Sequence, residues 1–133
     1  MKKAVLFLLL LFPLWQACTG HGHAPGTVQT NNGQLWKANP ETTAGIASMQ
    51  AILAKYEGKT GDATARTALQ EELELAFQDI FKKCTMTGEA HEQLHNYLLP
   101  MKNMFEKIGS ATESGPALEQ LKKHLAEYQN YFE

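Results

Sequence analysis

The chain has 133 residues, of which 12 are lysine or arginine and 14 are aspartate or glutamate, and its formal net charge is −2. This acidic balance gives no basic surface for a nucleic acid, so we expect no nucleic-acid partner. Hydrophobic residues make up 44% of the chain, which is enough for one domain with a modest core.

Residues 1–17 are predicted to be a signal peptide. Lys2 and Lys3 precede an apolar segment, residues 4–14, which has the length of a secretory signal and is too short to span a bilayer. The signal carries two of the 12 basic residues and none of the acidic ones, so the remaining 116 residues carry a net charge of −4.

The end of the signal resembles the lipobox of bacterial lipoproteins, because the small residue Ala17 stands directly before Cys18. Trp15 and Gln16 depart from the usual lipobox residues. The alternative, ordinary cleavage at an Ala-x-Ala site, places the bulky Trp15 at position −3 and fits less well. The resemblance implies that Cys18 is the lipid-modified first residue of a mature protein. That protein is then anchored to a bacterial membrane in the cell envelope, with its domain on the periplasmic or outer face.

Residues 18–36 are rich in glycine, histidine, threonine and asparagine, and this composition predicts a flexible tether. The folded domain is then expected over residues 37–133.

Two helices are predicted in the first half of this domain. The first begins at Pro40 after the capping residue Asn39 and runs to about Tyr56, and the second follows the capping residue Asp62. Their apolar stripes are Ile46, Met49, Leu53 and Tyr56 in the first, and Leu69, Leu73, Phe77, Ile80 and Cys84 in the second.

Two more helices follow. The third begins after Thr87 and ends at Gly109, and Pro100 inside it predicts a kink. The fourth opens at Ser114 with Pro116 in its first turn. Their stripes are His91, Leu94, Leu98, Met101, Phe105 and Ile108 in the third, and Leu118, Leu121, Leu125, Tyr128 and Phe132 in the fourth.

No segment shows the alternation of a strand, so the fold class is all-α. Four amphipathic helices with short connections predict an antiparallel, up-down-up-down four-helix bundle. Trp36, Tyr128, Tyr131 and Phe132 fall at one end of this bundle and are expected to close its core. His124 is expected on an exposed flank.

One stretch of the chain gathers metal-ligand side chains: Cys84, Met86, His91 and His95. Cys84 continues the stripe of the second helix and His91 begins the stripe of the third, so the short connection should bring them face to face. His95 follows His91 by four residues and shares its helix face. Thiolate, thioether and imidazole ligands together favour copper(I), whereas zinc accepts cysteine and histidine but rarely methionine. The sequence therefore predicts a soft-metal site, with copper preferred to zinc.

Two other interpretations of these residues stay open. In the first interpretation, Cys84 is an inert core cysteine and the bundle is a structural or interaction module for an envelope protein. The second is a thiol redox sensor with His91 as the base. It ranks last because the negative end of a helix dipole opposes thiolate formation at Cys84, and we therefore expect no enzyme.

The stretch from Cys84, Cys-x-Met-x-Gly-x-Ala-His-x-x-Leu-His-x-Tyr-Leu, resembles one shared by small bacterial lipoproteins of uncharacterised function. The segments Trp36-Lys-x-Asn39, Gly45-Ile46 and Leu125-Ala-Glu-Tyr128 fit the same pattern, so the resemblance covers most of the chain after the signal. It implies an exported lipoprotein and no particular activity.

Overall fold

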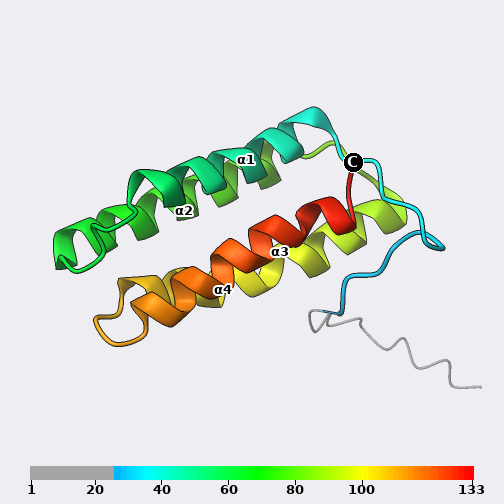
Figure 1. Ribbon diagram of the computed structural model, residues 1–133. Coiled ribbons are helices and arrows are strands. Elements are labelled where there is room, and N and C mark those ends of the chain that lie inside the picture. The colour runs from blue at the N-terminus through cyan, green and yellow to red at the C-terminus, as the bar shows by residue number, and fades with distance from the viewer. Residues whose placement is uncertain (1–25) are drawn as a thin grey trace, which may run out of the picture.

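The computed structural model describes residues 26–133, and these residues form an all-helical bundle (Figure 1). Its elements are α1 (Pro40–Lys55), α2 (Ala63–Lys83), α3 (Gly88–Gly109), α4 (Ser114–Ala126) and a short 3₁₀ helix, η1 (Glu127–Asn130). The predicted signal peptide and Cys18 lie outside the described residues.

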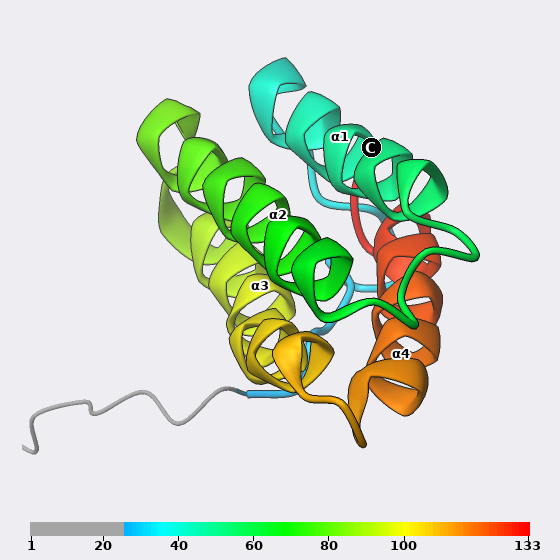
Figure 2. The same cartoon turned by 90° about the vertical axis from the view of Figure 1, so that its left-hand side faces the viewer.

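The four helices run up, down, up and down, as predicted, because each connection is short. Figure 1 shows the α2–α3 connection and the C-terminus at one end of the bundle, and the other two connections at the opposite end. In the end view of Figure 2, α1 lies beside α2 and α4, and α3 completes the square. Within residues 26–133, no helix has the length and apolar character needed to cross a bilayer.

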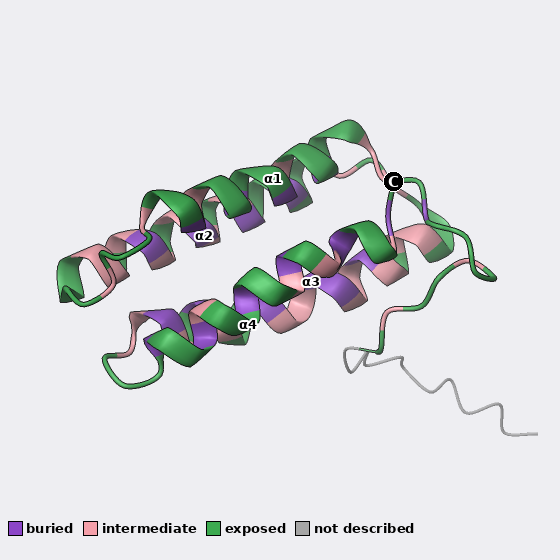
Figure 3. Cartoon of the chain, in the orientation of Figure 1, coloured by how far each residue is buried: buried purple, intermediate pink, exposed green. Residues whose placement is uncertain are grey.

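Most residues of the predicted apolar stripes form the core, and Figure 3 shows the buried residues facing the space between the helices. The predicted stripe residues that are only half-buried are Tyr56, Cys84, His91 and Leu118. Tyr97 is fully buried although it stands outside the predicted stripe of α3. Trp36, Tyr128 and Phe132 are buried at the end of the bundle where they were expected. The fourth helix, which we predicted to reach Phe132, ends at Ala126 and is followed directly by η1.

The helix ends show which caps form. The side chain of Asp62 accepts a hydrogen bond from the backbone N–H of Ala65 at 2.9 Å, which caps α2. Thr87 stands at the start of α3 without a capping side-chain bond, and α3 continues through Pro100 to Gly109.

Asn39 joins the start of α1 to the end of α2. Its Oδ1 accepts a hydrogen bond from Thr42 Oγ1 at 2.7 Å, and its Nδ2 donates to the carbonyl of Lys83 at 3.1 Å. The last carbonyls of a helix lack partners within the helix. Asn39 therefore satisfies one of them and fixes the point where the chain leaves α2.

The segment before α1 packs against the bundle over the part that the structure describes. The backbone N–H groups of Gly26 and Gln29 donate to the side chains of Asn96 and Gln93 on α3, at 3.1 and 2.8 Å. Trp36 forms an isolated parallel bridge with Phe132, and its indole N–H donates to the carbonyl of Gln29 at 2.6 Å. Residues 26–36, which composition alone assigned to the tether, thus contact α3 and the C-terminal segment.

A two-residue turn at Asn32 and Gly33 lies within this segment. Asn31 and Gln34 form an antiparallel bridge, and the turn residues have φ angles of 52° and 85°. Asparagine followed by glycine is the pair that tolerates two positive φ angles in a tight hairpin turn. This dipeptide was the signal for the turn, although no strand was predicted here.

Helix α1 packs closely on α2 at Gly45. A Cβ atom added at Gly45 would collide with the side chain of Ile80, which is buried in the core. Glycine within a helix usually destabilises it, but Gly45 is the residue that allows these two helices to approach.

Helices α3 and α4 are joined by a reciprocal contact between Tyr97 and His124. The Tyr97 hydroxyl donates to the carbonyl of His124 at 2.7 Å, and His124 Nε2 donates to the carbonyl of Tyr97 at 2.7 Å. The two rings stack, with centroids 4.4 Å apart. His124, which was expected on an exposed flank, is a half-buried link between the two helices.

The close approach at Gly45 gives a first prediction. Gly45→Ala in an open helix would stabilise by about 0.5–1 kcal/mol, but here it should lower the free energy of unfolding by about 1–3 kcal/mol because the core must shift to admit the methyl group. Denaturant unfolding measures the change. Ser48→Ala, at an exposed position of the same helix, is the control and should change stability by no more than about 0.5 kcal/mol. A stabilised Gly45→Ala protein would contradict the close packing of α1 on α2.

The buried Tyr97 gives a second prediction, on alkaline stability. Burial, with smaller contributions from Tyr128, Glu127 and Tyr131, raises the pKa of Tyr97 far above its ordinary value. Above about pH 10 the unfolded chain loses this proton and the folded protein keeps it, so the stability that is present below pH 10 falls by about 1.4 kcal/mol per pH unit.

Chemical denaturation between pH 9 and 12 tests this. At neutral pH the Tyr97→Phe protein should be less stable than wild type, because the His124 carbonyl loses its donor, but its stability should fall less steeply as the pH rises above 10. Equal slopes in the two proteins would show that Tyr97 is ionised in the folded state.

Candidate functional site

Cys84 and His91 meet across the connection between α2 and α3. Cys84 is the residue at which the chain leaves α2, and its backbone is already extended, with φ −66° and ψ 124°. His91 stands in the first turn of α3. Cys84 Sγ lies 3.5 Å from His91 Nδ1, and both side chains are half-buried.

His95 lies one turn further along α3, and its ring lies against the ring of His91. The centroids of the two imidazole rings are 4.3 Å apart, and the rings are tilted by 49°. The His95 ring also contacts the ring of Phe81 from α2, with centroids 5.4 Å apart and an edge-to-face angle of 61°. Four side chains thus form two rungs between α2 and α3, in which Cys84 faces His91 and Phe81 faces His95.

Phe81 was absent from the predicted site. It precedes Cys84 by three residues and so shares its helix face, which was the available signal. Phe81 also packs edge to face on Phe77, with ring centroids 5.0 Å apart, and Phe77 packs on Phe105 in the core. A continuous series of ring contacts therefore leads from the core to the two imidazoles.

Met86 lies in the connection, residues 84–87, and its side chain packs partly buried against the core. Within residues 26–133, no group of three or more histidine, cysteine, aspartate or glutamate side chains is arranged to hold a metal ion. The structure therefore places the thiol and one imidazole in contact and the second imidazole beside the first. It does not converge all the predicted ligands on one point.

The spacing of the Cys84–His91 pair is compatible with two kinds of chemistry. A thiol S–H and a ring nitrogen at this distance form a weak hydrogen bond. With metal–sulfur and metal–nitrogen distances near 2.3 and 2.0–2.1 Å, two ligand atoms of a tetrahedral ion also stand about 3.6 Å apart. A cation can therefore enter between Cys84 and His91 with little movement of either side chain.

Two helix ends meet at this site and their partial charges oppose each other. Cys84 stands at the negative C-terminal end of α2, and His91 stands at the positive N-terminal end of α3. The dipole of α2, which was the sequence argument against a thiolate, is therefore offset by that of α3.

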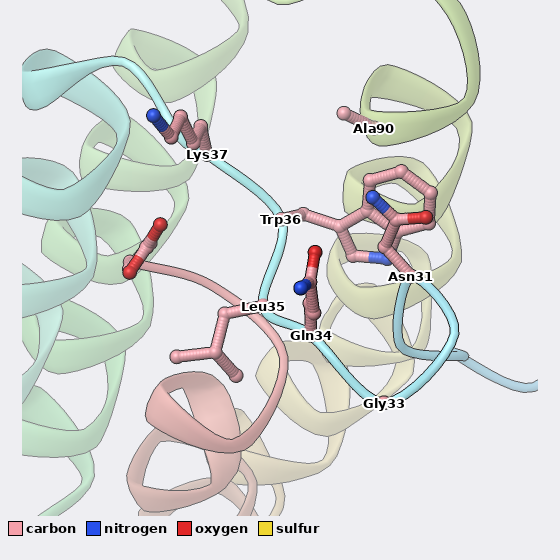
Figure 4. A pocket seen from close by; sticks show the side chains of 8 residues that line it. Asn31, Gly33, Gln34, Leu35, Trp36, Lys37 and Ala90 are labelled. Carbon is pink, nitrogen blue, oxygen red and sulfur yellow. The ribbon is translucent and has the colours of Figure 1, made fainter.

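A hollow at this end of the bundle lies between the segment before α1, the start of α3 and the C-terminal residue (Figure 4). It has a volume of about 690 Å³. Its lining residues are Asn31, Gly33, Gln34, Leu35, Trp36, Lys37, Ala90 and Glu133. None of the four predicted ligands lines it, so this hollow and the Cys84–His91 pair are separate features.

The chain was compared with protein-family models, with curated proteins and with solved structures, and no match was found in any of the three comparisons.

Proposed function

We propose that this protein is a lipoprotein of a bacterial cell envelope that binds a soft metal ion, copper(I) in preference to zinc, where α2 meets α3. The observation that carries the proposal is the 3.5 Å separation of Cys84 Sγ and His91 Nδ1. A thiolate and an imidazole at the spacing of two ligands of one ion are a partly assembled site, because the fold has already brought them together from two helices.

The softness of the donors favours copper(I). Cys84 supplies a thiolate, and the nearest soft donor in the chain is the thioether of Met86, two residues on in the same connection. His91 supplies an imidazole, and His95 beside it is the next nitrogen donor. Zinc sites are almost always four-coordinate and rarely include methionine, so this donor set suits zinc less well.

Membrane attachment through Cys18 fits a binding protein of this kind. The chain after the signal is mildly acidic and offers no basic surface that would hold it to an anionic membrane by charge. Lipid on Cys18 would supply the attachment instead. The same location is oxidising, where a lone thiol such as Cys84 is protected when it is bound to a metal.

The second candidate is a non-catalytic interaction lipoprotein in which Cys84 is an inert core residue. The absence of a three-ligand group among residues 26–133 favours it. The Cys84–His91 contact is then a hydrogen bond that closes the end of the bundle. The two candidates differ in one measurable property, the response of stability to a metal ion.

Thermal unfolding with and without copper(I), under reducing conditions, makes that measurement. A ligand that binds only the folded protein stabilises it by about 2.7 kcal/mol at a hundred times its dissociation constant, so the wild-type melting temperature should rise by several degrees. Cys84→Ser and His91→Gln should each abolish the rise. His21→Gln with His23→Gln, outside the predicted site, is the matched control and should preserve it. An equal response in wild type and Cys84→Ser would remove Cys84 from any site, and no response in wild type would favour the interaction lipoprotein.

Lipid attachment has its own test. The intact mass of the protein from envelope fractions should correspond to a chain that begins at Cys18 and carries acyl groups. Cys18→Ser should yield protein without the added mass that no longer fractionates with membranes. A Cys18→Ser protein that fractionates like wild type would exclude anchoring through this residue.

A further inference from the structure

The first described residues of the chain are held on α3. The backbone N–H of Gly26 donates to the Asn96 side chain at 3.1 Å, and that of Gln29 donates to the Gln93 side chain at 2.8 Å. Val28, between them, packs partly buried against the core. Figure 2 shows this segment beside α3, on the side of the bundle away from α1. The chain that precedes Gly26 therefore meets the folded domain at one definite place, next to Asn96.

The reach of the proposed lipid anchor is short compared with the bundle, and the inference drawn from it rests on the anchoring proposed above. Cys18 stands eight residues before Gly26. Eight residues span at most about 26–29 Å when fully extended, and about 14–17 Å on average when a chain is flexible.

The thickness of the bundle sets the scale for this reach. α1 and α3 lie at opposite corners of the square in Figure 2. Neighbouring helix axes lie about 8–10 Å apart and a helix with its side chains is about 10–12 Å across, so the outer surfaces of α1 and α3 are about 21–26 Å apart. The average reach from Gly26 is therefore too short to bring the α1 side to the bilayer.

Charge is compatible with α3 lying nearest the lipid. The chain after the signal carries a net charge of −4, so anionic headgroups repel it as a whole. Residues 93–105 of α3 contain no acidic residue and one basic residue, Lys102. α2, by contrast, exposes Glu71 and Asp79. Residues 42–54 of α1 are also uncharged, so charge alone does not separate α1 from α3, and the reach of the anchor decides between them.

We infer that the short anchor holds one face of α3 against the membrane. This α3 face consists of Gln93, Asn96, Pro100 and Asn103, which follow one another at intervals of three and four residues. Amide side chains form hydrogen bonds with polar groups and are costly to bury in hydrocarbon, so the contact is with the headgroup layer. α1 then faces away from the membrane.

Photo-cross-linking to lipid measures which face lies on the bilayer. p-Benzoylphenylalanine replaces Asn103 on the α3 face in one protein and Ser48 on α1 in the other, and both positions are exposed. Each protein is isolated from the cell envelope with its lipid on Cys18 and placed in vesicles of phosphatidylethanolamine and phosphatidylglycerol. Position 103 should yield at least about fivefold more lipid adduct than position 48, because the short anchor gives the α3 face a high effective concentration at the lipid.

The controls change the anchor and leave the bundle intact. Inserting about 20 glycine and serine residues before Gly26 raises the average reach to about 26–32 Å, which exceeds the thickness of the bundle, so the difference between the two positions should fall below about twofold. The same residues added after Glu133 leave the anchor unchanged and should preserve the difference. Gln93→Ala with Asn96→Ala removes both acceptors on α3, which lengthens the free chain and should also reduce it.

Four results would overturn the inference. Equal adducts at positions 103 and 48 in protein that carries lipid would leave the anchoring intact and exclude a preferred face. An excess at position 48 would place α1 on the bilayer instead. An excess at position 103 that survives the insertion before Gly26 would show that the length of the anchor does not determine the orientation. Envelope protein without lipid on Cys18 would refute the anchoring itself, and the inference would fail with it.

Discussion

The short connection between α2 and α3 is the constraint on which the Cys84–His91 end of the bundle depends. α2 ends at Lys83 and α3 begins at Gly88, so the chain must reverse within residues 84–87. The reversal makes the two helices antiparallel neighbours, and residues on their facing stripes then pair in rungs. Cys84 meets His91 because Cys84 is the last position of its stripe before the turn and His91 is the first position of its stripe after the turn.

The point at which α2 ends is fixed from outside that helix. Asn39 binds the carbonyl of Lys83, and the same side chain accepts a hydrogen bond from Thr42 at the start of α1. Two helix ends therefore meet within one small network, which also includes the backbone N–H of Thr85, a donor to Asn39 Oδ1 at 3.4 Å. Asn39 thus binds the residues on both sides of Cys84, and a change at Asn39 should reach the site. The Tyr97–His124 link and the close packing at Gly45 stabilise other parts of the bundle, whereas the hydrogen bonds of Asn39 stabilise this end.

The sequence predicted those parts of the structure that follow from periodicity and local chemistry. The apolar stripes, the cap at Asp62 and the order of the helices all arise from interactions within one helix or between neighbours in the chain. Tyr97 was missed, although it follows Leu94 by three residues and precedes Met101 by four, and so lies on the same helix face. The pattern within α3 could not show the partner of its hydroxyl, because Tyr97 donates to the carbonyl of His124, 27 residues away in the chain.

The site shows the same division between local and distant information. The contact of Cys84 with His91 follows from the stripes and the length of the turn. The contact of His95 with Phe81 does not, because Phe81 comes from the opposite helix, and residue spacing places two side chains on one face without fixing their rotamers. The Asn32-Gly33 turn was readable from its dipeptide alone, whereas the bridge of Trp36 to Phe132 joins the two ends of the domain and had no local signal.

The two rungs show what the fold brings together at this end of the bundle and what it leaves apart. Cys84 and His91 are in contact, the His95 ring lies against the rings of His91 and Phe81, and Met86 packs partly buried against the core. Among residues 26–133, no three histidine, cysteine, aspartate or glutamate side chains are arranged to hold a metal ion. A metal ion bound at the Cys84–His91 pair, as proposed above, would therefore have to draw in its further ligands by movement of side chains.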